Sequence, residues 1–159
     1  MQRIRFNSIL ILGATAALLM TTPNVSQAQR AHLGPRVGYN FDTHDAFFSL
    51  ALTAPIAPRV SFYPSVDVYT PETGSRTGFN GDLRVQIPTV QGPELYTGGG
   101  VNVLSRSVAN RSNTDVGGNL FLGLQGRSGW VHPFAEGRVL IHDNTSFQLS
   151  GGLNFTIGR

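Results

Sequence analysis

The last stretch of the chain, residues 145–159, reads TSFQLSGGLNFTIGR and alternates apolar with polar residues. Because the side chains of a β-strand point to opposite faces in turn, this alternation predicts a strand with one apolar and one polar face. The apolar face comprises Phe147, Leu149, Gly151, Leu153, Phe155 and Ile157. A strand at the end of a chain exposes its hydrogen-bonding edge unless it is paired, and closing a sheet into a barrel pairs it.

Seven earlier segments alternate in a similar way, and short runs rich in Pro, Gly, Asp and Asn separate them. They are residues 33–41, 46–54, 59–70, 79–89, 94–104, 115–125 and 130–142. No segment has apolar residues at helical spacing. We therefore predict an all-β chain, specifically an eight-stranded antiparallel up-and-down barrel with its longest loops at residues 71–78 and 105–114.

The first residues have the layout of a secretory signal peptide. Arg3 and Arg5 form a basic start, residues 9–20 are apolar or small, and Ser26 and Ala28 supply the small-x-small pattern of a cleavage site. A membrane-spanning anchor is the alternative, but an anchor needs roughly 20 apolar residues and this run is shorter. We therefore divide the chain into a signal peptide, residues 1–28, and a β-barrel domain, residues 29–159.

The charge of the chain does not indicate nucleic-acid binding. The formal net charge of +3 includes Arg3 and Arg5, which the expected cleavage removes. The ten arginines that remain of twelve are scattered and accompany nine acidic residues, so no basic patch forms. Cysteine is absent, and an exported domain without disulfides must be stabilised by a core, a closed sheet or a membrane.

The charged residues indicate which face of the sheet points inward. Four arginines and four acidic residues share the polar parity of the predicted strands, and we predict that they form an ion network in the lumen. They are Arg36, Arg59, Arg84, Arg138, Asp67, Asp82, Glu94 and Glu136. Eight strands enclose a lumen that side chains just fill, and paired charges tolerate burial. The apolar parity then faces lipid, as in a transmembrane β-barrel; unrelated surface charges on a soluble sheet are the alternative.

For two of these carboxylates, the sequence also predicts where they lie relative to each other. A symmetric loop over residues 71–78 places Asp67 opposite Asp82, where like charges repel. Arg84 or Arg138 would compensate them, and a bound Ca²⁺ is the alternative, although two carboxylates are too few ligands by themselves. We predict no metal site, no cofactor, and a lumen that is plugged by arginine–carboxylate pairs and has negligible conductance.

The C-terminal segment resembles the assembly signal of outer-membrane β-barrels. The residues that carry this resemblance are Ser150, Gly152, Phe155 and Ile157. Many members of that family end on the aromatic residue itself, whereas Gly158 and Arg159 follow here. Together with stretches 95–101 and 132–137, the segment makes the chain similar to the small eight-stranded barrels of OmpA and OmpX type. The resemblance implies the outer membrane of a Gram-negative-type bacterium, contacts with outer-membrane lipid and with the barrel-assembly machinery, a monomer, and no nucleic-acid partner.

We predict a structural or surface-interaction role without catalysis. The first alternative is a lipid A-modifying outer-membrane enzyme that uses His142 and Ser146, because a deacylase family keeps a His and a Ser at this rim. A nucleophile needs its base within hydrogen-bond reach, which a sequence does not show. The second alternative is a soluble periplasmic β-barrel that binds a small apolar ligand.

Overall fold

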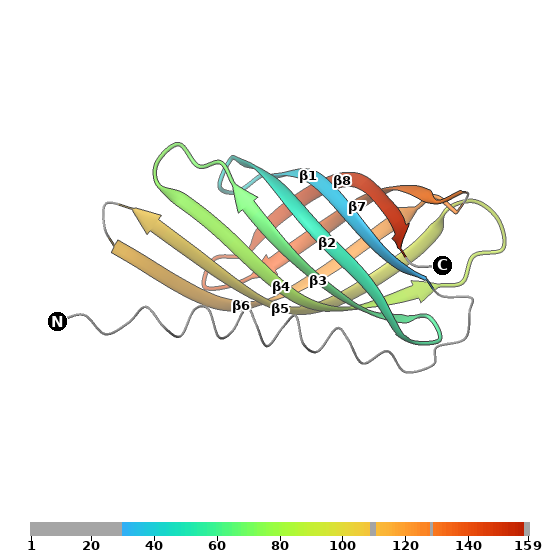
Figure 1. The fold of residues 1–159 in the computed structure, drawn as a ribbon. Coiled ribbons are helices and arrows are strands. Elements are labelled where there is room, and N and C mark those ends of the chain that lie inside the picture. The colour runs from blue at the N-terminus through green and yellow to red at the C-terminus, as the bar shows by residue number, and fades with distance from the viewer. Residues whose placement is uncertain (1–29, 109–110, 128, 158–159) are drawn as a thin grey trace.

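The computed structural model describes residues 30–108, 111–127 and 129–157, and these form a closed barrel (Figure 1). The predicted signal peptide and the final residues Gly158 and Arg159 lie outside this described part. Within it, the chain forms eight strands. They are β1 (Ala31–Asn40), β2 (Asp45–Ala57), β3 (Val60–Tyr69), β4 (Ser75–Ile87), β5 (Glu94–Val108), β6 (Arg111–Gln125), β7 (Val131–Ile141) and β8 (Ser146–Ile157). No helix among the described residues has the length and apolar character needed to cross a membrane.

Each strand pairs with its neighbours in the chain, and β8 pairs back with β1. The closing ladder runs from Ala31 opposite Ile157 to Asn40 opposite Gln148. The start of β1 and the end of β8 therefore lie at the same end of the barrel, which we call the near end (Figure 1). The far end carries the β1–β2, β3–β4, β5–β6 and β7–β8 connections. The predicted eight-stranded antiparallel barrel is confirmed, and so is the closure of the last strand on the first.

Side chains alternate between the lumen and the outer surface along the strands. In β8, Gln148 is 1% exposed, whereas the next residue, Leu149, is 50% exposed. The lumen holds buried arginines, carboxylates and amides, and the outer surface carries exposed Leu, Val, Ile and Phe side chains. A soluble barrel buries its apolar parity instead. The structure places the polar parity inside, as the charge pattern predicted.

Aromatic side chains gather at both rims of the outer surface. At the far end, the ring centroid of Phe41 lies 5.3 Å from that of Tyr39 and 5.7 Å from that of Phe147. At the near end, the rings of Trp130 and Phe155 lie 5.7 Å apart. Aromatic rings on both sides of an apolar band are typical of barrels that cross a membrane, where they lie at the level of the lipid headgroups.

The structure corrects the two long-loop predictions. Residues 75–78 belong to β4, residues 105–108 belong to β5, and β6 already begins at Arg111. The β5–β6 ladder extends to Val108 opposite Arg111, and each of these two strands has 15 residues. In the part of this hairpin beyond residues 104 and 115, polar residues occupy both faces, so the sequence shows no alternation there. Its backbone groups nevertheless pair, because ladder hydrogen bonds do not depend on side-chain polarity.

The end predicted for the second segment is also corrected. β2 continues through Pro55 to Ala57, and its register with β3 shifts between these two residues. An irregularity of this kind accommodates a proline, which has no N–H to give to the ladder. Arg59 follows in the turn with a positive φ of 65°.

Candidate functional site in the barrel lumen

Glu136 on β7 is the centre of a buried ion network. Its Oε1 accepts hydrogen bonds from Arg36 Nη1 and from Arg138 Nη2, both at 3.0 Å. Its Oε2 accepts a third from the Tyr96 hydroxyl at 3.2 Å. One carboxylate therefore serves two guanidinium groups, which come from strands β1 and β7, and a phenol from β5.

Two aspartates complete this central network. Arg36 Nη2 donates to Asp67 Oδ1 at 2.8 Å, and Arg138 Nη1 donates to Asp82 Oδ2 at 2.7 Å. Asn80 donates to the other oxygen of Asp67 at 2.8 Å. Buried charges are tolerated when they are paired and when further hydrogen bonds satisfy their remaining atoms. The network joins β1, β3, β4, β5 and β7 and blocks the lumen between them.

The eight predicted lumen residues do not all meet. The central network contains Arg36, Asp67, Asp82, Glu136 and Arg138. Arg84 lies outside it, with Cζ 3.7 Å from the centroid of the Tyr96 ring and Nη2 donating to Gln125 Oε1 at 3.1 Å. Arg59 is exposed in the β2–β3 turn, and Glu94 is half-buried at the start of β5. These last two line a cavity at the near end.

The expectation that Asp67 lies opposite Asp82 is wrong. Asp67 pairs with Gly78, and Asp82 pairs with Tyr63, because β4 starts at Ser75 and the β3–β4 turn lies closer to β3 than predicted. Each aspartate has its own arginine. Within the described residues, no group of three or more His, Asp or Glu side chains is placed to hold a metal ion.

An ion pair that was not predicted from the sequence lies at the far end. Arg76 Nη1 donates to Asp45 Oδ2 at 2.9 Å and to Thr43 Oγ1 at 2.7 Å. The guanidinium also lies over the ring of Tyr69, with Cζ 4.3 Å from its centroid. In the sequence, Arg76 falls within the predicted loop 71–78 and Asp45 falls between two predicted strands, although both continue the polar parity of the adjoining strands. With this pair, the described lumen contains four buried arginines and four buried carboxylates, but not the predicted eight.

Two clusters of buried apolar side chains pack beside these ion pairs in the lumen. One contains Phe47, Tyr69 and Leu104 and adjoins the far-end ion pair. The other contains Ala51, Tyr63, Tyr96 and Phe121 and lies against Arg84 and Arg138. In the sequence, Tyr63, Tyr69, Tyr96 and Phe121 fall on the polar parity of their segments, and the structure buries all four rings in the lumen.

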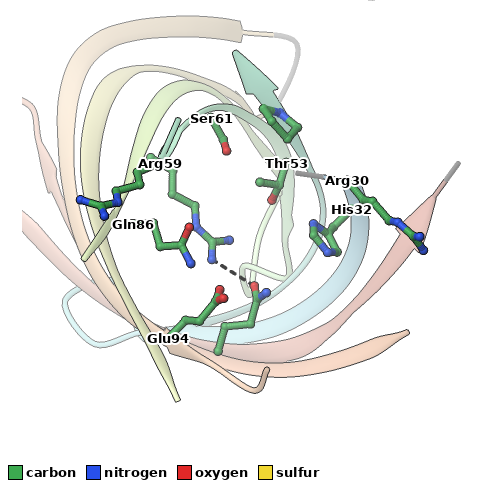
Figure 2. A pocket seen from close by; sticks show the side chains of 10 residues that line it. Arg30, His32, Thr53, Arg59, Ser61, Gln86 and Glu94 are labelled. Atoms are coloured by element: carbon green, nitrogen blue, oxygen red, sulfur yellow. Dashed lines mark hydrogen bonds between the residues drawn. The ribbon is translucent and has the colours of Figure 1, made fainter. Parts of the chain in front are cut away.

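The near end of the lumen is hollow. Two cavities of about 140 and 320 Å³ share the lining residues Arg30, His32, Glu94 and Gln125. Figure 2 shows the smaller cavity with Arg30, His32, Thr53, Arg59, Ser61, Gln86 and Glu94 around it. The dashed line in this view is the hydrogen bond from Arg84 to Gln125. The lumen is thus filled in its centre and at the far end, and open at the near end.

The structure does not bring His142 and Ser146 together. Ser146 Oγ is buried and accepts a hydrogen bond from Asn40 Nδ2 at 3.2 Å. His142 is half-buried beyond the end of β7, and no hydrogen bond joins it to Ser146 in the described part of the chain. This geometry lacks the contact that an activated serine requires.

The four residues of the predicted assembly signal occupy both faces of β8. Ser150 is buried, whereas Phe155 and Ile157 belong to the outer face. Gly152 lies where β1 and β8 come close: a Cβ at this position would lie 2.3 Å from the carbonyl oxygen of Pro35. A glycine is therefore needed for the two closing strands to approach at this rung. Recognition of these residues by the assembly machinery stays a prediction.

Neither the protein-family models nor the curated proteins contain a match to this chain. Several solved structures share its fold, and two of them are small β-barrels. The N-terminal β-barrel domain of Pseudomonas aeruginosa OprF has a TM-score of 0.70 at 12% sequence identity, and the match covers 80% of this chain and 96% of that one. Neisserial surface protein A (NspA) has a TM-score of 0.58 at 14% identity, with 80% and 95% covered. The chain therefore has the fold of the small eight-stranded outer-membrane β-barrels.

Proposed function

We propose that the protein is a small outer-membrane β-barrel of a Gram-negative-type bacterium, with a structural or surface-interaction role and no catalysis. This proposal rests on which face of the sheet points outward and which points into the lumen. Apolar side chains cover the outside, and charged and amide side chains are buried inside. Such an exterior is stable in lipid and would aggregate in water.

The orientation follows from the chain ends. Export through a signal peptide delivers the barrel to the periplasm, so the near end, which carries both ends of the barrel domain, faces the periplasm. The far end then faces the outside of the cell and presents the β5–β6 hairpin (Figure 1). Outer-membrane lipid is the expected surrounding, a monomer the expected state, and the barrel-assembly machinery the expected partner during insertion.

Two alternatives fit the geometry less well. A lipid A-modifying enzyme would need a serine activated by a base, and the Ser146 hydroxyl accepts from Asn40 instead. A soluble barrel that binds an apolar ligand would need an apolar interior, whereas this lumen contains four buried arginines and four buried carboxylates. A structural role needs only loops and strand ends at the surface, and the barrel provides these.

Cell fractionation tests the location. We expect the protein in the outer-membrane fraction, and we expect a heat-dependent shift on SDS gels, because a closed barrel resists SDS until it is boiled. A soluble periplasmic pool without this shift would refute the proposal.

A pair of β8 variants tests the direction of the faces. Leu153→Arg places a charge on the lipid face, and we expect it to lower the free energy of unfolding by roughly 2–4 kcal/mol. Gln148→Ala removes one lumen hydrogen bond, to Tyr69, and should cost about 1 kcal/mol. Urea unfolding of the refolded barrel in lipid vesicles measures both. Equal losses would mean that the barrel does not face lipid as proposed.

A further inference from the structure

Arg84 differs from the other buried arginines of the described chain. Arg36, Arg76 and Arg138 each form a salt bridge with at least one carboxylate. Arg84 forms none with any described residue, and its one side-chain hydrogen bond goes to the uncharged Gln125. A guanidinium has five N–H donors, so most of those on Arg84 are available to a ligand.

The position of this guanidinium is fixed by the aromatic cluster. Its Cζ lies 3.7 Å from the ring centroid of Tyr96 and 5.8 Å from that of Tyr63. Tyr96 is held in turn by its hydrogen bond to Glu136. Arg84 also lines the 140 Å³ cavity, so one side of the group rests on the rings and another faces the open space. A charged group that is held in place before a ligand arrives loses little entropy on binding.

The cavity lining carries an excess of positive charge. The described residues that line the two cavities include three arginines, Arg30, Arg59 and Arg84, and one carboxylate, that of Glu94. The hydroxyl of Thr53, on the wall of the smaller cavity, is buried and has no hydrogen-bond partner in the protein. Cationic groups and a spare O–H donor at one cavity suit a ligand that brings negative charge and acceptor oxygens.

We infer that the near-end cavity is a binding site for a small oxyanion, a carboxylate or a phosphate, that accepts hydrogen bonds from Arg84 and Thr53. A volume of about 140 Å³ is close to the roughly 150 Å³ cavity that holds a benzene molecule, so the bound head group is small. The site is reached from the near end. That this end faces the periplasm rests on the proposed function, but the chemistry of the site does not.

Arg84 has a second role that needs only its charge. The central network contains three carboxylates and two arginines, so the charge of Arg84 beyond the Tyr96 ring offsets the third carboxylate at longer range. Anion binding needs the planar fork of N–H donors as well as the charge. Arg84→Lys separates the two roles, because lysine keeps the charge and loses the fork.

The test is a titration of the purified barrel, refolded in detergent micelles, with sodium acetate and with inorganic phosphate at constant ionic strength set by chloride. Calorimetry or the shift of the Arg84 Nε–H resonance reports binding. We expect saturable binding of one of these anions, and about tenfold weaker binding in Arg84→Lys and Arg84→Gln, the loss of roughly one charge-assisted hydrogen bond. Glu94→Gln should tighten binding, because it removes the carboxylate that repels the ligand.

Arg106→Gln is the matched control, since it removes an exposed arginine of β5 at the far end. Its affinity should equal that of the parent protein. No saturation with either anion, or equal weakening in Arg84→Gln and the control, would overturn the inference. Preference for acetate identifies a carboxylate ligand, and preference for phosphate a phosphoryl ligand. The heat-dependent gel shift shows that each variant still folds, and fractionation tests the proposed location separately from the site.

Discussion

The central and far parts of the lumen differ from the near end in how their arginines are neutralised. In the centre, Arg36 and Arg138 share Glu136 and each has its own aspartate, and at the far end Arg76 has Asp45. At the near end, Arg84 lies on an aromatic ring and has an amide partner. The paired arginines belong to filled regions, and Arg84 borders a cavity.

The comparison indicates that arginine, as a residue type, can have two different roles in the same barrel. An arginine that is paired within the protein crosslinks strands and closes the lumen. An arginine without a carboxylate partner, such as Arg84, keeps donors for a ligand, and the ring of Tyr96 below it stabilises its charge. Three variants test how large the difference is.

Glu136→Ala should have the largest effect. The substitution leaves Arg36 and Arg138 without the carboxylate that they share, and removing one partner of a buried ion pair costs about 3–5 kcal/mol. Urea unfolding in lipid vesicles measures this loss. Glu72→Ala, at an exposed position between β3 and β4, is the control and should change stability by less than about 0.5 kcal/mol. A similar cost in both variants would show that the network does not hold the barrel closed.

Arg76→Ala should have an intermediate effect, about 2 kcal/mol. It removes the hydrogen bonds to Asp45 and Thr43 and the cover over the Tyr69 ring, but water at the far rim can solvate the aspartate that remains. The same unfolding measurement applies, with Arg106→Ala as the control. A cost as large as that of Glu136→Ala would mean that the far-end pair is as isolated from water as the centre.

Arg84→Lys should have the smallest effect on stability, about 1 kcal/mol. It keeps the charge and loses one hydrogen bond to Gln125 and part of the stacking on Tyr96. If this variant unfolded as readily as Glu136→Ala, Arg84 would be a structural crosslink, and the contrast between the two regions would disappear.

Most of the fold could be predicted from the sequence, because a barrel depends on a period of two that side-chain polarity displays directly. The closing strand, residues 145–159, alternates clearly, and β8 occupies Ser146–Ile157. The far part of the β5–β6 hairpin, residues 105–108 and 111–114, could not be predicted as strand, since polar residues lie on both of its faces. The limits of β2 and β4 were misplaced for a related reason: Pro55 and the Pro71–Gly74 region look like the ends of strands, yet turn register depends on three-dimensional packing.

The sequence predicts that charged side chains line the lumen, but it does not predict which of them contact one another. Parity placed Arg36, Asp67, Asp82, Glu136 and Arg138 inside, and the structure brings them together. Parity does not give depth along the barrel, so the sequence could not separate Arg59 and Glu94, at the near-end mouth, from the residues in the centre. Depth depends on the stagger between strands, which each turn sets locally.

The β1–β8 seam has a consequence for the order of folding. The other ladders of the barrel join strands that follow one another in the chain, whereas β1 and β8 come from its two ends. Hairpins close short loops and form readily, but the seam must bring together residues more than a hundred positions apart. Arg36 is on β1 and Glu136 is on β7, 100 residues away, so their ion pair forms only when the sheet curls round. The Arg36–Glu136 ion pair is therefore a contact of the closed barrel that an open sheet of the same strands lacks.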